Sequence, residues 1–312
     1  MNAVIVSTKA SVYFAELLSK KLDIPFLGTE RTIFGGGERY YRLDISDRND
    51  LFGKDVIFDG STHNDESLLE IIRVGETLAT LGTRRRIFVN SFFGYSTMER
   101  EKNPGENIAA KSCARMLSNI PGGSDNTFLM MDLHIAGLVH YFEGDCIRRE
   151  LYAENILLAA FNKLGFTGFM MATPDLGRSD WVESYYIKLS AIDMAFIRKA
   201  RRGENVEIKH VIGDVRGKVI VIYDDMYRSG KTLLQAIEAY IKAGAIAVYV
   251  IISHLAANDE GSLLKLEKSP IEKLIVTNSH PMSQHPLVQQ STKIIVEDVS
   301  EIYERVIRSL LT

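Results

Sequence analysis

The sequence is poor in the features that mark secreted and membrane-bound proteins. It contains only two cysteines, Cys113 and Cys146, among 312 residues. Two cysteines are too few for a disulfide framework, so we expect reduced thiols in a cytoplasmic protein. No apolar run reaches the roughly 18 residues that a transmembrane helix requires. The first 21 residues also lack the basic start and long apolar core of a signal peptide. We therefore expect no membrane partner.

An excess of positive charge is absent as well. The chain has 37 Lys and Arg against 40 Asp and Glu, which gives a net charge of −3. Without a basic field over the whole molecule we expect no nucleic-acid partner, and any anion site must be local. The content of 46% hydrophobic and 25% charged residues is that of a globular protein. The length suggests two domains of about 150 residues each.

Short β-branched runs alternate with helical patterns, which predicts an α/β fold with mostly parallel sheets. Strands are expected at 3–7, 55–59, 85–93, 128–133, 168–174, 209–215, 218–225, 247–253 and 273–279. Helices are expected after the first strand and at 65–81, 106–120, 148–165 and 231–244, the last ended by a C-cap glycine, Gly244.

The alternation restarts near residue 150, after the polar segment 142–149. We therefore place a domain boundary there, between a domain of residues 1–147 and a domain of residues 148–312. The last helix is a candidate for packing back on the first domain. In open α/β sheets, ligands bind beyond the carboxyl ends of the strands. The loops at strand ends are therefore where chemistry is expected.

One such strand end, "YDDMYRSGKT", resembles the tail of an ATP-binding P-loop. That motif needs a glycine five residues before Gly230, and Asp225 stands there instead. Asp224 and Asp225 would repel a triphosphate, but they suit sugar hydroxyls or a metal ion. We interpret the segment as an acidic pair for a sugar, followed by a turn at 228–232 that binds phosphate at the N-terminus of the next helix.

Two other strand ends carry groups that could bind a metal ion. Asp132 and His134 follow one strand, and Asp175 follows another in a turn with Pro174 and Gly177. A histidine and a carboxylate from separate strand ends could share a Mg²⁺ ion. A purely structural role stays open for each, because Asp beside Pro is ordinary turn chemistry.

Four cations lie together at Arg198, Lys199, Arg201 and Arg202. Their mutual repulsion predicts a solvated, mobile loop. A mobile cationic loop is also what a phosphoryl-transfer site needs in order to close over developing charge.

Two segments of the first half are rich in glycine or polar residues. The segment 32–44, which contains Phe34 and Glu38, predicts a flexible hairpin; no helix follows it, so it is not a dinucleotide fingerprint. The segment 91–112 predicts a long polar loop before a helix, and loops of this length are usually functional or mobile.

Taken in order, these segments make the chain similar to the ribose-phosphate diphosphokinase family, the PRPP synthetases, over nearly its whole length. Six motifs carry the resemblance in the family's order: "NSFFGY…ER…PGENIAAKSCARMLS", "MMDLHIAGLVHYF", "ATPDLG", "AFIRKARRG", "VIVIYDDM…SG.T" and "SPIEKLIVTNSHP". No one of them is decisive alone, but six in register exclude chance.

The resemblance implies two phosphoribosyltransferase-like domains, each a mostly parallel sheet flanked by helices. It implies Mg²⁺, ATP as co-substrate, and a homo-oligomer built from dimers, up to a hexamer, with an ATP site completed across a subunit interface. The implied reaction transfers the β,γ-diphosphate of ATP to the anomeric hydroxyl of a 5-phosphorylated ribose and releases AMP. Such a reaction needs mainly alignment and charge neutralisation.

The resemblance also assigns residues by position. Ribose and phosphate binding falls to Asp224, Asp225, Arg228, Ser229, Gly230, Lys231 and Thr232. ATP binding falls to Phe34, Glu38, Arg100 and His134. Catalytic roles fall to Lys199, Arg201 and His134, and metal binding falls to His134 and Asp175.

The chain departs from the family pattern at ligand positions. Near ATP, Gly36 replaces an acid, and Thr97 and Met98 stand where the family has arginine and glutamine. In the phosphate turn, Arg228, Ser229 and Lys231 replace an acid, a threonine and a glycine. The turn after "ATPDLG" gains Arg178 and Trp181, and this tryptophan either stacks on a base or packs in the core.

The added cations favour an acceptor with more negative charge at its 5-position than a phosphate monoester has. ADP-ribose fits this description, and its product would be ADP-ribose 1-pyrophosphate for NAD resynthesis, as in a phage-associated branch that the chain resembles. Ribose 5-phosphate, which would give PRPP, is the conservative acceptor.

Two other functions stay open. The altered ATP positions are compatible with a non-catalytic regulatory homologue, although retention of the charged residues in the reaction path argues against it. A phosphoribosyltransferase that consumes PRPP shares the acidic-pair turn, but it does not explain the matching first half.

Overall fold

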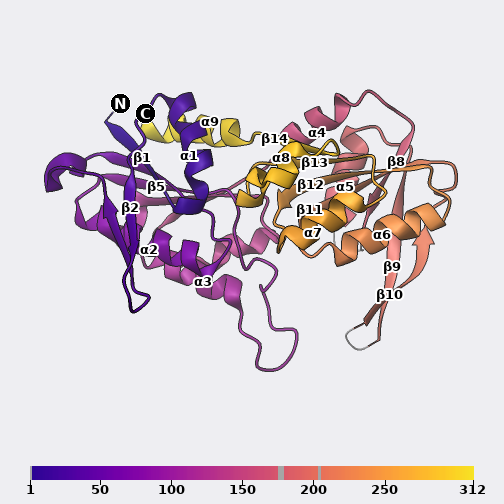
Figure 1. The fold of residues 1–312 in the computed structure, drawn as a ribbon, viewed down its shortest axis with the longest axis horizontal. Helices are drawn as coiled ribbons and strands as arrows, with labels where there is room; N and C mark the ends of the chain where they lie inside the picture. The colour runs from indigo at the N-terminus through magenta and orange to yellow at the C-terminus, as the bar shows by residue number, and fades with distance from the viewer. Residues whose placement is uncertain (1, 175–178, 203–204) are drawn as a thin grey trace. The chain divides into compact units, whose positions relative to one another are not determined.

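The computed structural model describes the backbone of residues 2–174, 179–202 and 205–312, and the side chains of residues 2–174, 181–198 and 210–312. The chain divides into two compact units. Unit 1 comprises Met1–Tyr152 and Val299–Thr312, and unit 2 comprises Ala153–Asp298. The chain therefore passes from one unit to the other twice, and its last helix belongs to the unit in which the chain begins (Figure 1).

Unit 1 is built on a five-stranded parallel sheet in the order β1-β4-β5-β6-β7. Its strands are β1 (Ala3–Ser7), β4 (Asp55–Asp59), β5 (Arg85–Asn90), β6 (Asn126–Met131) and β7 (Ile147–Leu151). Its helices are α1 (Val12–Leu22), α2 (Asp65–Thr80), α3 (Ala109–Ser118) and α9 (Ser300–Leu311). Helices α1 and α9 lie on one face of the sheet, and α2 and α3 lie on the other (Figure 1). Because both faces are covered, the inner strands β4, β5 and β6 are almost wholly buried and mostly apolar in their middles.

A two-stranded antiparallel hairpin, β2 (Thr29–Ile33) and β3 (Arg39–Leu43), is added to unit 1. It confirms the hairpin expected at 32–44. Its turn is closed by a hydrogen bond from the Phe34 N–H to the Glu38 carbonyl, with a donor–acceptor distance of 2.9 Å.

Unit 2 is built on a seven-stranded sheet in the order β10-β9-β8-β11-β12-β13-β14. Its strands are β8 (Phe169–Thr173), β9 (Asp193–Arg202), β10 (Asn205–Ile212), β11 (Val219–Tyr227), β12 (Ala247–Leu255), β13 (Lys273–Thr277) and β14 (Ile294–Glu297). Its helices are α4 (Glu154–Asn162), α5 (Ser179–Lys188), α6 (Lys231–Lys242), α7 (Glu260–Lys268) and α8 (Pro286–Gln290). Every pairing is parallel except that of β9 with β10. Two mainly parallel sheets flanked by helices confirm the expected α/β fold class.

In the described part of the chain, short 3-10 helices also lie at Lys9–Ser11, Arg48–Leu51, Gly123–Asp125, Ala136–Tyr141 and Pro281–Gln284. No helix in the described part of the chain is long and apolar enough to cross a membrane. Both cysteines are buried and free.

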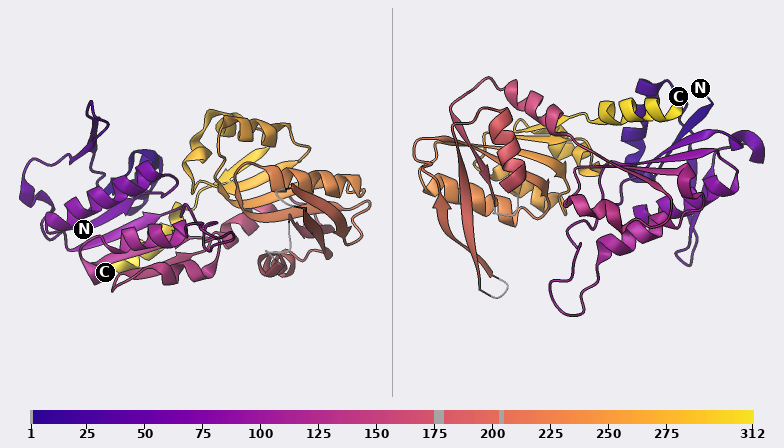
Figure 2. Two further views of the ribbon diagram at one scale, coloured as in Figure 1. Left: turned by 90° about the horizontal axis from the view of Figure 1, so that it is seen from below. Right: turned by 180° about the vertical axis from the view of Figure 1, so that it is seen from behind.

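Two sequence expectations were wrong in their element type. The helix expected at 148–165 begins only at Glu154, and the residues before it form β7, the edge strand of the first sheet. The cationic segment 198–202 was expected to be a loop, but it is the end of β9 and pairs with β10. The β9–β10 pair forms a long arm of unit 2, visible from two sides in Figures 1 and 2. In both cases strand pairing with a neighbour overrides a local pattern rich in charge.

Helix α9 is held in unit 1 by packing and by hydrogen bonds. Tyr303 packs edge-on against Phe14 of α1, with ring centroids 5.6 Å apart. The Arg85 guanidinium donates to the carbonyl of Leu310. The helix lies next to α1 (Figure 1). The end of the chain therefore covers one face of the first sheet.

Asp59, the last residue of β4, is an unusual group in this sheet. It is fully buried, and neither carboxylate oxygen has a hydrogen-bond donor among the described residues. Burial raises its pKa well above the ordinary value, because a carboxylate loses its hydration in an apolar environment. Burial also raises the pKa of Tyr303 on α9. The buried carboxyl is therefore favoured in its neutral form.

We predict that Asp59→Asn removes a pH-dependent loss of stability. A carboxyl whose pKa is raised on folding stabilises the protein below its unfolded pKa, and this contribution is lost as the pH rises through the folded pKa. The free energy of unfolding of the wild type should therefore fall relative to that of the variant, by up to about 1.4 kcal/mol per pH unit. Urea unfolding at pH 5, 7 and 9 measures the difference. The exposed Asp145→Asn is the matched control, and a wild-type-to-variant difference that stays constant with pH would contradict the prediction.

Candidate functional site

In unit 2, the acidic pair lies at the carboxyl end of β11, between β8 and β12 near the middle of the sheet. Asp225 is 5% exposed and Asp224 is half-buried. The Asp225 N–H donates to Asp224 Oδ1 at 3.0 Å. A main-chain contact thus orients one carboxylate. Two acids at the end of a central strand can accept hydrogen bonds from sugar hydroxyls or contact a cation.

The turn after β11 leads directly into α6, as the sequence predicted for a phosphate site. Gly230 is the N-cap of α6 with a left-handed φ of 78°, and its carbonyl accepts from the Leu234 N–H at 2.8 Å. Ser229, Lys231 and Thr232 are exposed around it. The N-terminal N–H groups of a 12-residue helix, together with an exposed lysine, form a positive site that suits phosphate.

A glycine is required at this turn because a tyrosine lies beneath it. A Cβ on Gly230 would lie 2.3 Å from the Tyr227 hydroxyl. That hydroxyl cannot easily move, since it donates to the Ser262 carbonyl at 2.7 Å within the core. The Tyr227 hydroxyl therefore fixes how closely the backbone of the turn at 228–232 approaches the core. The sequence did not predict this role, because a tyrosine in an apolar run indicates only a strand residue.

Beside the acids lies a stack of three aromatic rings. Tyr223 of β11 stacks on Tyr185 at 4.4 Å and on Trp181 at 5.9 Å, both of which belong to α5. Tyr185 and Tyr223 are fully buried, whereas Trp181 is only half-buried. One face of the Trp181 ring therefore packs on the protein. Of the two roles considered for Trp181, the described contacts show packing on Tyr223.

In unit 1, the hairpin turn presents Phe34 to solvent. The Phe34 side chain is 51% exposed, and its ring centroid lies 5.8 Å from that of Tyr40. Glu38 is also exposed, on the other side of the turn. An exposed aromatic ring next to a carboxylate can contact the flat face and the amino edge of a base.

The loop at 91–108 is anchored near its start by contacts with Thr62, and farther along it exposes Arg100 to solvent. The Gly94 N–H donates to Thr62 Oγ1 at 2.8 Å, and a Cβ on Gly94 would lie 1.9 Å from the Thr62 carbonyl oxygen. Farther along, the Glu99 carbonyl accepts from the Tyr141 hydroxyl at 2.6 Å. Arg100 then points outward, 75% exposed, with an ion pair of 3.2 Å to Glu99. The loop thus presents the predicted ATP-binding arginine on an anchored base.

The predicted metal and catalytic residues are described only in part. His134 follows β6 and is half-buried. Lys199 and Arg201 lie on β9, but their side chains, like all of Asp175 and Arg178, are outside the described residues. Among the described residues, no group of three or more His, Cys, Asp and Glu side chains could hold a metal ion. Oxygen donors suited to Mg²⁺ are present at Asp224 and Asp225.

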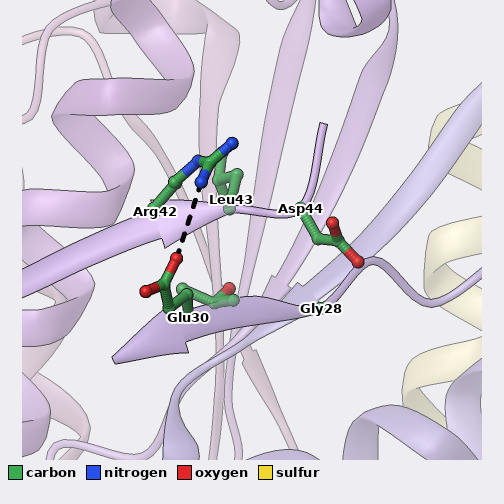
Figure 3. A pocket seen from close by; sticks show the side chains of 6 residues that line it. Gly28, Glu30, Arg42, Leu43 and Asp44 are labelled. Atoms are coloured by element: carbon green, nitrogen blue, oxygen red, sulfur yellow. Dashed lines mark ion pairs between the residues drawn. The ribbon is translucent and has the colours of Figure 1, made fainter. Parts of the chain in front are cut away.

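A shallow surface hollow lies at the base of the hairpin (Figure 3). It is lined by Gly28, Thr29, Glu30, Arg42, Leu43 and Asp44. The ion pair across it, Arg42 to Glu30 at 3.7 Å, is largely exposed. No residue predicted to bind a ligand lies in this hollow.

Two family models match separate parts of the chain. The model of the N-terminal domain of ribose phosphate pyrophosphokinase matches residues 3–120, and that of the phosphoribosyl synthetase-associated domain matches residues 194–312. The ribose-phosphate pyrophosphokinase of Marinomonas sp. is 28% identical over 292 residues, which cover 92% of this chain and 90% of the relative. The enzyme of Gloeobacter violaceus is 28% identical over 88% of this chain and 81% of its own length. The chain is a homologue of the ribose-phosphate pyrophosphokinases.

This pyrophosphokinase homologue shares its fold with a solved relative. The phosphoribosylpyrophosphate synthetase from Mycobacterium smegmatis superposes with a TM-score of 0.86, over 100% of this chain and 99% of that chain, at 21% sequence identity. The chain spans only 66% of the chloroplastic ribose-phosphate pyrophosphokinase 1 of rice, to which it is 29% identical.

We predict that Gly230→Ala destabilises this pyrophosphokinase homologue more than Gly217→Ala does. Both glycines have a positive φ, of 78° and 68°, but no atom lies within 4 Å of a Cβ on Gly217. The backbone strain of about 1–2 kcal/mol should therefore be shared. The clash with Tyr227 should add about 1–3 kcal/mol at Gly230 alone.

Urea unfolding of the two variants measures the difference in stability. Equal losses would show that the Tyr227 hydroxyl does not support the turn.

Proposed function

We propose that this protein is a Mg²⁺-dependent diphosphokinase that transfers the β,γ-diphosphate of ATP to the anomeric hydroxyl of a 5-phosphorylated ribose. The main support is the end of β11, where an acidic pair for a sugar leads directly into a helix N-terminus for a phosphate. The homology to ribose-phosphate pyrophosphokinases over both units supports the same reaction.

In the proposed reaction, the anomeric oxygen of the ribose attacks the β-phosphorus of ATP. The bond from this phosphorus to the oxygen shared with the α-phosphate breaks, AMP leaves with that oxygen, and the hydroxyl proton passes to solvent. Asp224 and Asp225 hold the ribose hydroxyls, while residues 228–232 hold the 5-phosphate. Lys199 and Arg201 balance the charge that develops on the transferred group.

The nucleotide is proposed to bind through groups of unit 1. Phe34 and Glu38 contact adenine, and Arg100 and His134 contact the phosphates. Mg²⁺ bound with ATP would neutralise phosphate charge, and His134 and Asp175 are the proposed protein ligands. We further propose a homo-oligomer built from dimers, up to a hexamer, in which a neighbouring subunit completes the ATP site.

The proposed acceptor is ADP-ribose, with ribose 5-phosphate as the conservative alternative. Arg228 and Lys231 are both exposed at the phosphate turn, so the turn offers more positive charge than a phosphate monoester needs. Trp181 lies on α5, with its ring 5.9 Å from that of Tyr223 and hence near the acids. These features support a diphosphate and a planar base beyond the ribose.

We expect AMP release from Mg-ATP with ADP-ribose as acceptor, at a higher kcat/KM than with ribose 5-phosphate. Phosphorus NMR should show a new anomeric diphosphate on the acceptor. Turnover with ribose 5-phosphate alone would remove ADP-ribose as the substrate and keep the diphosphokinase reaction.

We also expect Lys231→Gly to discriminate between the two acceptors. Loss of one charge-assisted hydrogen bond should raise the KM for ADP-ribose about tenfold, and the KM for ribose 5-phosphate by less, because the shorter acceptor has fewer phosphate oxygens to pair. The control is Lys242→Ala, which removes an exposed lysine at the far end of α6. Equal effects of Lys231→Gly on both acceptors would argue against contact with a second phosphate.

Two alternatives rest on specific features. Gly36, Thr97 and Met98 alter the ATP positions and favour a non-catalytic regulatory homologue, which absence of AMP formation with any ribose phosphate would support. The acidic-pair turn is shared with phosphoribosyltransferases, and release of pyrophosphate from PRPP and a base would support that activity.

A further inference from the structure

The β2–β3 hairpin needs an anchor if its tip is to bind a ligand in one orientation. A two-stranded hairpin is marginally stable alone in water. Ile33 and Phe34 near its turn are 60% and 51% exposed, so the tip gains little from burial. The orientation of the tip must therefore be fixed farther down the strands.

Two ion pairs join the hairpin to helix α2, one from each strand. Arg31 of β2 pairs with Glu70 at 2.7 Å between Nε and Oε1. Arg39 of β3 pairs with Glu66 at 2.6 Å between Nη1 and Oε1. The two glutamates are four residues apart and share one face of α2. The two arginines share one face of the hairpin, since Arg31 is opposite Tyr41 and Arg39 is two residues before it.

The two pairs differ in burial and in the number of groups they join. Glu66 is half exposed, whereas the side chain of Glu70 is 3% exposed. Arg31 also donates to the carbonyls of Thr29 and Ser7, each at 2.7 Å. Arg31 thus joins the hairpin both to α2 and to the end of β1. An exposed pair contributes little, while a buried and fully bonded pair is costly to break.

The buried carboxylate of Glu70 depends on Arg31 to remain ionised. Burial raises the pKa of Glu70, whereas the charge and hydrogen bond of Arg31 and the Lys9 N–H act to lower it. The Lys9 N–H donates to Glu70 Oε2 at 3.3 Å. Without Arg31, the carboxyl would be left buried with this one long hydrogen bond, and the neutral form would be favoured.

We propose that Arg31 and Glu70 are positioning residues, which hold the hairpin so that Phe34 and Glu38 meet the adenine ring of ATP. This inference rests on the proposed function, which places adenine at the hairpin turn. Neither residue touches the nucleotide; both act by fixing the strands that carry the turn. A fixed turn binds with less loss of conformational freedom than a mobile one.

The kinetic test compares Arg31→Gln and Glu70→Gln with Arg42→Gln. Arg42 lies on the same hairpin, on the opposite face, in an exposed pair with Glu30 (Figure 3). Arg31→Gln and Glu70→Gln should raise the KM for ATP about tenfold or more, with kcat and the acceptor KM changed less than about threefold. Arg42→Gln should change the KM for ATP less than about twofold. Arg31→Lys should recover part of the loss, because it keeps the charge but not the three-way bonding.

A second measurement does not depend on catalysis. Hydrogen–deuterium exchange of the hairpin amides in residues 29–43 should speed up about tenfold or more in Arg31→Gln and Glu70→Gln, while the amides of β4 and β5 keep wild-type rates. If the wild type shows no turnover of ATP, the proposed function fails, and this exchange result alone decides whether the anchor exists.

Three outcomes would overturn the inference. The first is a KM for ATP that stays within about twofold of wild type in both variants. The second is a parallel rise in the KM of both substrates with faster exchange throughout unit 1, which would indicate general destabilisation. The third is hairpin exchange that is unchanged in Arg31→Gln.

Discussion

Both sheets of this protein are covered by helices, and that burial restricts polar side chains to the ends of the strands. The interior of β1, β4 and β6 is apolar on both faces. A charged group in the middle of such a strand would be desolvated without compensation. Asp224, which lies at the end of β11, is half-buried and escapes part of this cost, while its neighbour Asp225 is 5% exposed. Burial of the sheets is thus the reason that the candidate residues Asp224 and His134 lie where strands end.

Asp59 shows that a position at a strand end does not always give a carboxylate access to solvent. It ends β4 beneath the face that α9 covers, where no described residue donates to either carboxylate oxygen. The raised pKa is the physical consequence. The protein tolerates a neutral acid at this position, whereas at the end of β11 Asp224 is half-buried and accepts from a main-chain N–H, which keeps it suited to a ligand. The same residue type therefore has different chemistry at two strand ends.

The exposed segments that carry candidate ligand-binding residues are held in place by contacts with the rest of their unit. The phosphate turn rests on the buried Tyr227 hydroxyl, and the loop at 91–108 starts from a glycine pressed against Thr62. The hairpin is tied by Arg31 to both α2 and β1. Each of these exposed segments is therefore joined to a buried part of its unit. Such an arrangement fixes the orientation of a loop while leaving its tip accessible.

The sequence by itself determined the α/β class, most of the inner strands and the acidic-pair turn, because apolar runs and turn residues are local signals. It misread β7 and the end of β9, because pairing at a sheet edge outweighs a charged local pattern. Only the tertiary structure revealed the support of Gly230 by Tyr227, the packing of one face of Trp181, and the ion pair of Arg31 with Glu70. These contacts join residues far apart in the chain, and nothing in either local segment specifies its partner.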